Sequence, residues 1–263
     1  MQTLINSLSV NTYGDKNNQA IVFVHGFPFD HTMWDEQIKF FKNNYFCVAY
    51  DIRGLGKSEP GDGQFTMEMF VEDLFAVIDG LKLVKPVICG LSMGGYITLR
   101  ALQLNQYLFK AVILCDTRSE ADNDEGKLKR AKAIKQINEE GTGKFVEDFI
   151  SGLFADVTKE ERPNLYKSFV NKYKTQNPIG VKGASIAIMS RTDTTKFLPE
   201  IKIPALLLCG SFDKLTPPIV MRGMAEKITN SEFAAIPMTG HMAPLENPGC
   251  TNDLINAFLN KIQ

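Results

Sequence analysis

The sequence has no long apolar runs, no excess of either charge and few histidines. Its longest strand-like apolar stretches resemble Ala20–Val24 in length, whereas a membrane helix needs about 18 such residues, so we expect no membrane span. The chain has 29 basic and 30 acidic residues, for a net charge of -1 over 263 residues. This balance argues against nucleic acid as a partner. Only three histidines are present, which leaves few candidates for acid–base chemistry.

The five cysteines show neither metal-ligand spacing nor the even count of a disulfide framework. We therefore expect free thiols in a reducing compartment. Four of them lie in apolar runs where burial is expected, namely Cys47, Cys89, Cys115 and Cys209. The first residues, Met1–Asn6, lack the basic and apolar regions of a secretory signal, so we expect a cytoplasmic protein.

Nucleotide and metal chemistry also find no support. The segment Gly54–Ser58 resembles the end of a phosphate-binding loop, but Asp51 stands where that motif requires its first glycine. The chain has no His-Glu-x-x-His motif. We expect no cofactor and no metal.

Short apolar runs alternate with segments of helical period along most of the chain. Runs that are apolar on both faces are typical of parallel strands covered by helices on both sides. The expected strands are Ala20–Val24, Phe46–Tyr50, Pro86–Cys89, Ala111–Cys115, Ala205–Cys209 and Phe233–Ile236. Thr3–Tyr13 alternates loosely and is expected to add an antiparallel edge. The pattern predicts an α/β fold with a doubly wound, mostly parallel sheet.

Thr66–Leu83 is predicted to form a helix with Thr66 as its N-cap, and Asn247 is predicted to cap the last helix. Between Arg118 and Thr195 no strand is expected. Helical segments are indicated around Lys127–Glu140, Gly143–Phe154 and Glu160–Lys174. Such an insertion commonly covers the sheet edge where ligands bind. We expect a core of residues 1–117 and 196–263 and a helical cap of residues 118–195, the alternative being a helical decoration without a role in binding.

The strongest chemical signal is Gly90–Gly94, with Ser92 at its centre, between a predicted strand and a predicted helix. A serine on such a tight turn projects its hydroxyl from the sheet edge, and small neighbours make the turn possible. The start of the helix also offers free N–H groups and a positive dipole end to negative charge. This arrangement predicts a nucleophilic serine, the alternative being a glycine-rich turn with a bystander serine.

A serine nucleophile needs a base, and the base needs a carboxylate that orients it. His241 follows the last predicted strand, and Asp213 follows the strand before it. Both therefore lie at the sheet edge expected for Ser92, and Asp116 is the alternative acid. We expect His25 and His31 to be structural. The N–H group of Met93, next to the nucleophile, is one expected oxyanion donor. Phe27, in the loop after the first buried strand, is the other, and Pro28 in the same loop cannot donate.

The sequence resembles the α/β-hydrolase superfamily, and within it small bacterial carboxylesterases, enol-lactone hydrolases and cofactor-free perhydrolases. The matching segments span nearly the whole chain: His25-Gly26, Asp51–Ser58, Gly90–Gly94, Asp213 and Gly240-His241. The resemblance implies an α/β-hydrolase fold with Ser92 as nucleophile, Asp213 as acid and His241 as base. The loop His25–Asp30 departs from the glycine-rich loop of many lipases, and a serine rather than an aspartate at position 92 argues against dehalogenases and epoxide hydrolases.

We therefore expect a serine hydrolase that cleaves a small carboxylic ester or lactone through an acyl-enzyme. Perhydrolase or haloperoxidase-like activity is the alternative, prompted by Pro28, and a ligand receptor of the same fold is a third hypothesis. Apolar residues near the site predict an apolar substrate pocket, with Phe29, Trp34, Leu215 and Met189 as candidates. The sequence does not indicate an oligomeric state.

Overall fold

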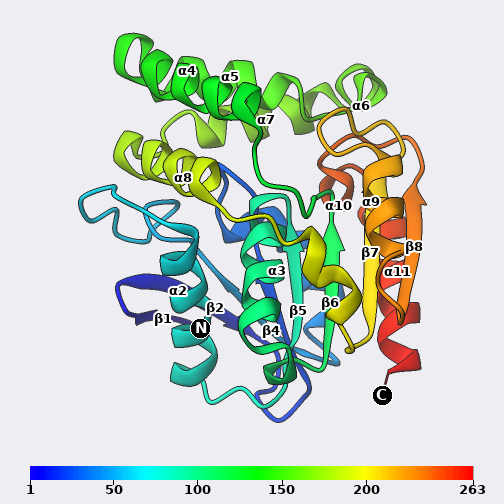
Figure 1. Ribbon diagram of the computed structural model, residues 1–263. Coiled ribbons are helices and arrows are strands. Elements are labelled where there is room, and N and C mark those ends of the chain that lie inside the picture. Colours follow the sequence, from blue (N-terminus) through cyan, green and yellow to red (C-terminus); the bar gives the residue numbers. More distant parts are fainter. Residues whose placement is uncertain (263) are drawn as a thin grey trace.

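A central sheet of eight strands organises the molecule, which a computed structural model describes over residues 1–262 (Figure 1). The strand order is β1-β2-β4-β3-β5-β6-β7-β8. The strands are β1 (Gln2–Ile5), β2 (Leu8–Tyr13), β3 (Ala20–Val24), β4 (Phe46–Tyr50), β5 (Val87–Leu91), β6 (Ala111–Cys115), β7 (Ala205–Gly210) and β8 (Ser231–Ile236). β1 and β2 form the antiparallel edge, and the other six strands run parallel. The predicted fold class is confirmed.

The burial of the strands explains their sequence pattern. Every residue of β3, β4, β5, β6 and β7 is buried, which is why these strands are apolar on both faces. β8 lies at the edge of the sheet and keeps only Ile236 buried. The carboxyl ends of the parallel strands meet along one rim of the sheet, so the loops that follow them are brought together.

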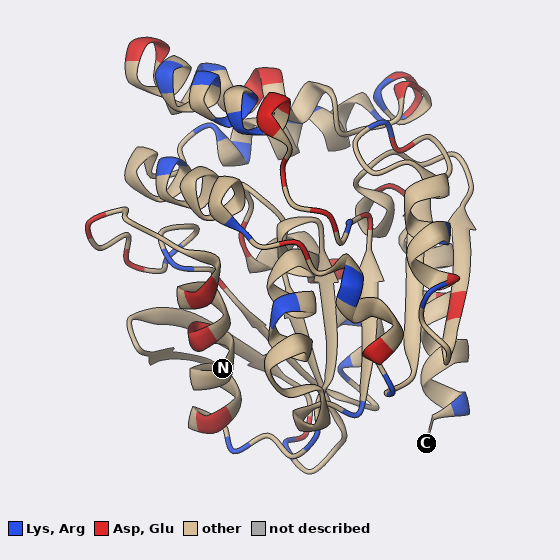
Figure 2. Cartoon of the chain, in the orientation of Figure 1, with Lys and Arg blue, Asp and Glu red and all other residues tan. Residues whose placement is uncertain are grey.

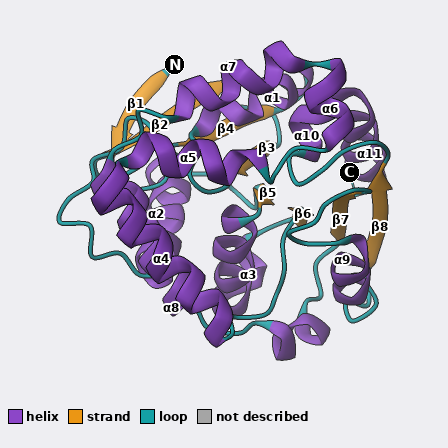
Figure 3. Ribbon diagram, turned by 90° about the horizontal axis from the view of Figure 1, so that it is seen from above, coloured by secondary structure: helices purple, strands orange, loops and turns teal. Residues whose placement is uncertain are grey.

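Helices cover both faces of the sheet, as the view from above makes clear (Figure 3). α1 (Asp35–Phe41) and α11 (Pro248–Lys261) lie on one face, and α2 (Met67–Gly80), α3 (Met93–Asn105) and α9 (Pro218–Ala225) lie on the other. The shorter elements are η1 (His31–Trp34), η2 (Gln106–Leu108), η3 (Thr195–Glu200) and α10 (Ala243–Glu246). Both predicted caps are present, because the side chains of Thr66 and Asn247 accept hydrogen bonds from backbone N–H groups in the first turns of α2 and α11.

Five helices enter the chain between β6 and β7, and we refer to them as the inserted helices. They are α4 (Asp124–Glu140), α5 (Thr142–Ser151), α6 (Asp156–Glu161), α7 (Pro163–Tyr173) and α8 (Pro178–Ser190). Figure 1 shows them above the rim formed by the carboxyl ends of the strands. The helical segment indicated around Glu160–Lys174 is divided at Pro163, which cannot continue α6 and whose fixed φ suits the first position of α7.

Charged side chains of both signs are interspersed over the molecule, and α4 carries both (Figure 2). This agrees with the balanced composition of the sequence. Across residues 1–262, no helix combines the length and the apolar character needed to cross a bilayer.

Candidate active site

Ser92 occupies the turn between β5 and α3 in an unusual backbone conformation. Its φ is 54° and its ψ is -114°, a combination that residues with a side chain rarely adopt. The Ser92 N–H donates to the Cys115 carbonyl over 3.0 Å, and the Ser92 carbonyl accepts the Thr117 hydroxyl over 2.8 Å. The loop after β6 therefore holds the strand-to-helix turn that the sequence predicts.

Gly94 lets this turn approach the end of the neighbouring strand β3. A Cβ added at Gly94 would lie 2.1 Å from the Val24 carbonyl oxygen and 2.8 Å from that of His25. A side chain cannot fit there. A Cβ added at Gly26 would lie 2.7 Å from the Leu91 side chain. The two glycines thus allow the loop after β3 to pack directly against the start of α3.

Asp213 and His241 form a buried pair at the same rim. Nδ1 of His241 lies 2.8 Å from Oδ2 of Asp213, and both side chains are almost completely buried. Oδ1 of Asp213 accepts the N–H groups of Leu215 at 2.7 Å and Thr216 at 3.0 Å. The Thr216 hydroxyl donates to Oδ2 over 2.5 Å and lies 3.2 Å from Nδ1 of His241. These donors fix the carboxylate in line with the imidazole.

The electrostatics of this pair favour an ionised Asp213. Burial alone would raise the pKa of the Asp213 carboxyl, but His241 and the hydrogen bonds from Thr216 hold it well below its ordinary value. An ionised carboxylate at Nδ1 makes that nitrogen the one that carries the proton, which leaves Nε2 with its lone pair. Nε2 of His241 is buried and has no hydrogen-bond partner among the described residues. The structure therefore brings Asp213 and His241 together but shows no hydrogen bond between this nitrogen and the Ser92 hydroxyl among the described residues.

The N–H groups of Phe27 and Met93 are the expected oxyanion donors. Met93 is the first residue of α3, so its N–H precedes the hydrogen-bonding pattern of the helix. Phe27 lies in the loop that Gly26 and Gly94 bring against the start of α3. Within residues 1–262, neither the Phe27 nor the Met93 N–H donates a hydrogen bond to another backbone group. Both groups remain free for a ligand.

His25 has a structural role, as the sequence predicts. It is fully buried. Its Nε2 accepts the Ile52 N–H over 2.9 Å, so its Nδ1 carries the proton and donates to the Gly26 carbonyl over 2.9 Å. Burial lowers the pKa of His25, which is consistent with this neutral form. The side chain therefore joins the loop after β3 to the loop after β4.

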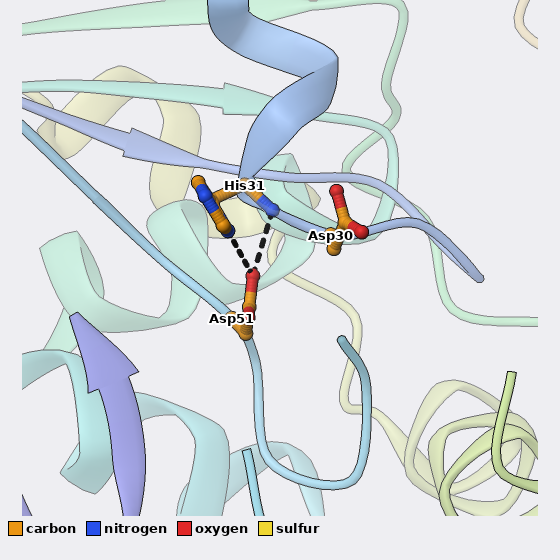
Figure 4. A group of neighbouring side chains, drawn as sticks. All are labelled: Asp30, His31 and Asp51. Carbon is orange, nitrogen blue, oxygen red and sulfur yellow. Dashed lines mark hydrogen bonds and ion pairs between the residues drawn. The ribbon is translucent and has the colours of Figure 1, made fainter. Parts of the chain in front are cut away.

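His31 makes a similar connection through Asp51, as Figure 4 shows. Nδ1 and the backbone N–H of His31 lie 2.6 and 2.9 Å from Oδ1 of Asp51, and Oδ2 accepts the Lys57 N–H. Although burial would raise the pKa of Asp51, the bonds from His31 lower it. Asp30, His31 and Asp51 are near enough to share a cation, but Asp30 already pairs with Lys172 at 3.4 Å and accepts the Tyr173 hydroxyl at 3.0 Å. We assign the cluster to structure.

The four candidate pocket residues differ in their surroundings. Phe29 is buried between Phe169 and Tyr173 of α7, with ring centroids 4.8 and 5.0 Å away. Trp34 is fully buried and packs on Phe23 at 5.3 Å. Leu215 is 37% exposed, and Met189 is half-buried in α8. Their part in a substrate pocket stays a prediction.

Aromatic rings from the inserted helices reach the loop after β3. The ring of Phe27 lies 6.1 Å from that of Phe145 and 5.4 Å from that of Phe149, both in α5. Phe149 is partly exposed, whereas Phe27 and Phe145 are buried. The residue expected to donate to the oxyanion is therefore covered by an apolar wall that the inserted helices supply.

Sequence reasoning missed two residues that contact the acid and base loops. Thr216 touches both Asp213 and His241, and its position three residues after Asp213 was the available signal. Glu246 is buried and accepts the N–H groups of Gly240 and Met242, the two neighbours of His241, at 2.9 and 3.3 Å. Nothing in the local sequence distinguishes Glu246 from a surface residue of a short helix.

Comparison with known proteins shows the same fold. The family model described as alpha/beta hydrolase fold matches residues 19–248. The structure of a thermophilic esterase from Thermogutta terrifontis superposes with a TM-score of 0.95 and is 31% identical in sequence, over 100% of this chain and 99% of that one.

Two curated relatives extend the comparison. A 3-oxoadipate enol-lactonase of Acinetobacter baylyi is 28% identical over 260 residues, which cover 98% of this chain and 94% of the relative. A bifunctional esterase/perhydrolase of Acinetobacter calcoaceticus is 26% identical over 261 residues, which cover 94% of each chain.

Proposed function

The chain belongs to the α/β-hydrolase fold family, and from this premise we propose that it is a serine hydrolase that cleaves a small carboxylic ester or lactone through an acyl-enzyme. The observation that carries the proposal is the Asp213–His241 pair at 2.8 Å, with Nε2 of His241 buried and unpartnered. With Nδ1 held by a carboxylate and no described protein group at Nε2, the imidazole can accept the proton of a serine hydroxyl that approaches Nε2. An esterase and an enol-lactonase among the similar proteins support the same substrate class.

In the proposed mechanism, Nε2 of His241 takes the proton of the Ser92 hydroxyl as its oxygen attacks the acyl carbonyl. Asp213 remains ionised and stabilises the imidazolium that forms. The N–H groups of Phe27 and Met93 bind the oxyanion, and the first turn of α3 adds the positive end of its dipole. His241 then protonates the leaving alcohol, and water activated by the same base releases the acid.

The inserted helices lie above the rim of the sheet that carries the proposed site (Figure 1). We propose that residues 118–195 act as a cap and residues 1–117 and 196–263 as the core that holds the three catalytic side chains. Contacts of Phe145 and Phe149 with Phe27 support this division. An apolar wall beside the oxyanion donors favours substrates with an apolar acyl group.

Labelling of the nucleophile tests the proposal most directly. A fluorophosphonate should modify Ser92, identified by mass spectrometry of the labelled peptide. Hydrolysis of a series of chromogenic acyl esters and one γ-lactone should be lost together in Ser92→Ala, with kcat lower by about 10⁴-fold. Ser211→Ala is a matched control, because Ser211 lies near Asp213 in the chain but its hydroxyl accepts the Met238 N–H, away from the acid–base pair.

Two results would contradict the proposal. One is turnover by Ser92→Ala at a rate near that of the wild type. The other is labelling that persists in Ser92→Ala at the same stoichiometry, which would place the activated nucleophile elsewhere.

Perhydrolysis is a second candidate, because Pro28 follows the proposed oxyanion donor and one relative is an esterase/perhydrolase. The same acyl-enzyme would then be attacked by hydrogen peroxide instead of water, forming a peracid. Measuring peracid formation and ester hydrolysis in acetate and peroxide gives the ratio of the two activities. A ratio no higher than that of an ordinary serine esterase would remove this candidate.

We also propose a reducing, cytoplasmic location. All five cysteines are free, and four of them are buried, as expected for a protein that does not form disulfides.

A further inference from the structure

Asp116 is a buried carboxyl that the proposed mechanism does not use. It follows the last residue of β6, is 0% exposed and has a φ of 43°. Aspartate and asparagine tolerate this left-handed conformation better than most residues with side chains. The Asp116 N–H donates to the Leu208 carbonyl of β7 over 2.9 Å. The residue thus joins the end of β6 to β7, the strand that leads into the loop with Asp213.

One carboxyl oxygen of Asp116 holds that loop. Oδ1 accepts the Gly210 N–H over 2.7 Å, and the Gly210 carbonyl accepts the Asp213 N–H over 3.1 Å. Asp116 therefore acts on the Asp213 turn through a single intervening residue. Its other oxygen, Oδ2, is buried and accepts no hydrogen bond from the described residues 1–262.

The charges around Asp116 oppose its ionisation. A carboxyl oxygen of Asp116 lies within 4.8 Å of one of Asp213 and of the Sγ of Cys209. Cys115, from its own strand, is a further titratable neighbour, and Asp213 in turn pairs with His241. No lysine, arginine or histidine of the described residues forms an ion pair with Asp116. Two buried carboxylates at this separation cannot both ionise without a large electrostatic penalty.

Asp213 is the member of the two that keeps the charge, because its oxygens accept four hydrogen bonds. We propose that Asp116 is a positioning residue for the triad: it stays a neutral carboxylic acid, fixes the Asp213 turn through Gly210, and leaves Asp213 as the sole negative charge facing His241. This inference rests on the proposed function, in which Asp213 is the triad acid. Asp116 itself does not touch the substrate.

The direction of the Asp116 pKa agrees with this role. Burial, together with the nearby Asp213 carboxylate, raises the pKa of Asp116 well above its ordinary value. In the unfolded chain the group loses its proton above about pH 4, whereas the folded protein retains it. Stability contributed by this group is therefore full below pH 4 and declines as the pH rises toward the folded pKa.

Asp116→Asn is the decisive variant, because an amide has the shape of the neutral acid and tolerates the same backbone conformation. We expect kcat within about three-fold of the wild type and an unchanged KM. We also expect a melting temperature that equals that of the wild type near pH 4 and exceeds it by about 3 °C or more at pH 8, since the amide does not titrate. Asp116→Ala, which removes the acceptor for Gly210, should lower kcat about ten-fold with little change in KM, and the asparagine should restore it.

Two matched aspartates complete the experiment. Asp122 is half-buried, which alone would raise its pKa, but it pairs with Arg191 and Arg130, which lower its pKa, so Asp122→Asn should lower the melting temperature at pH 8. Asp213→Asn should abolish activity. A band of a protonated carboxyl in the infrared spectrum of the wild type at pH 7, absent in Asp116→Asn, would establish the neutral acid independently of any assay.

The inference is overturned if Asp116→Asn melts below the wild type at pH 8, or if the infrared band is missing, since either result means an ionised Asp116. A folded Asp116→Asn that loses kcat as severely as Asp213→Asn would also overturn it. Failure of the proposed function gives a different result, namely unimpaired turnover in Ser92→Ala or Asp213→Asn. The infrared and melting measurements do not depend on turnover, so they test Asp116 in either case.

Discussion

The hydroxyl of Thr216 contacts both members of the Asp213–His241 pair, at 2.5 Å from the carboxylate and 3.2 Å from the imidazole. A hydrogen bond to a charged group contributes about 1.5–3 kcal/mol, so this contact is large enough to matter for both catalysis and acid stability. Its backbone N–H also donates to Asp213, and a substitution of the side chain leaves that second bond intact.

Thr216→Val is therefore expected to lower kcat about ten-fold without a large change in KM. It should also raise the pKa of Asp213. A depressed carboxyl pKa contributes stability that is present above the ordinary value near 4 and lost as the pH falls, so the acid unfolding midpoint of the variant should move to a higher pH. Steady-state kinetics and acid titration followed by circular dichroism measure the two effects.

Thr239→Val is the control for this prediction. Thr239 is equally buried and lies in the loop before His241, but its hydroxyl donates only to the Ile236 carbonyl. If the two valine variants behaved alike, the contact of Thr216 with the acid–base pair would have no special importance.

At the residue scale, the sequence predicts those roles that a local motif determines. The glycines around Ser92 indicate a strand-to-helix turn, and Thr66 and Asn247 indicate the starts of helices. The role of Asp116 is different, since its protonation depends on Asp213, which lies 97 residues later in the chain. No spacing rule connects the two positions before the fold brings them together.

The loop that carries His241 is attached to the inserted helices by Glu246, at the end of α10. One carboxylate oxygen accepts the N–H groups on either side of His241, and the other accepts the Ala155 N–H at 2.9 Å and the Thr158 hydroxyl at 2.6 Å. The His241 N–H itself donates to the Leu153 carbonyl over 2.7 Å. The start of α6 and the base loop are thus joined through one buried side chain.

Glu246→Gln is expected to destabilise the protein by about 2–3 kcal/mol. The amide NH₂ replaces one carboxylate oxygen and cannot accept hydrogen bonds, so the buried donors that bonded to that oxygen are left without partners. It should also lower kcat, since the neighbours of His241 lose their anchor. Urea denaturation and steady-state kinetics measure both quantities.

Thr158→Val separates the two sides of this connection. It removes only the bond from α6 and should cost about 1 kcal/mol with kcat nearly unchanged. A Glu246→Gln variant of normal stability and activity would mean that the base loop holds its position without the carboxylate.

At the element scale, the sequence predicts the buried strands best. β3, β4 and β6 begin and end at the predicted residues, because burial on both faces demands uninterrupted apolar runs. α8 was not predicted as a separate helix. Its two glycines and β-branched residues have low helix propensity, and the helix owes its form to packing, with Gly180 and Gly183 lying against Gly54, Gly63 and Phe65.

For the molecule as a whole, the inserted helices and the core are joined at several separate places. Besides Glu246, the side chain of Gln176 accepts the Gly56 N–H at 3.1 Å and donates to the Phe29 carbonyl at 3.3 Å. The Tyr173 hydroxyl donates to Asp30. The loop that holds the proposed oxyanion donor is therefore supported from the side of the inserted helices as well as from the sheet.

The accessibility of the thiols reports on the integrity of this whole assembly. Cys250 is partly exposed at the start of α11, whereas the other four cysteines are buried. We expect one thiol to react quickly with a disulfide reagent in the native protein and all five to react in urea. Rapid reaction of more than one thiol under native conditions would mean that the strands β4 to β7 open on the time scale of labelling.

The strained backbone conformation of Ser92, the proposed nucleophile, lowers the stability of the protein. A strained conformation of this kind costs about 1–3 kcal/mol, and glycine would adopt it without strain, although it gains about 0.5–1 kcal/mol of freedom in the unfolded chain. Ser92→Gly should therefore melt about 2–4 °C above Ser92→Ala, with both variants inactive, and calorimetry can compare them. Equal melting temperatures would indicate a relaxed turn.

A laboratory selection for heat resistance alone would consequently favour the loss of the serine and enrich inactive variants. An engineer who wishes to make this catalyst more durable must screen every round for turnover as well as for survival.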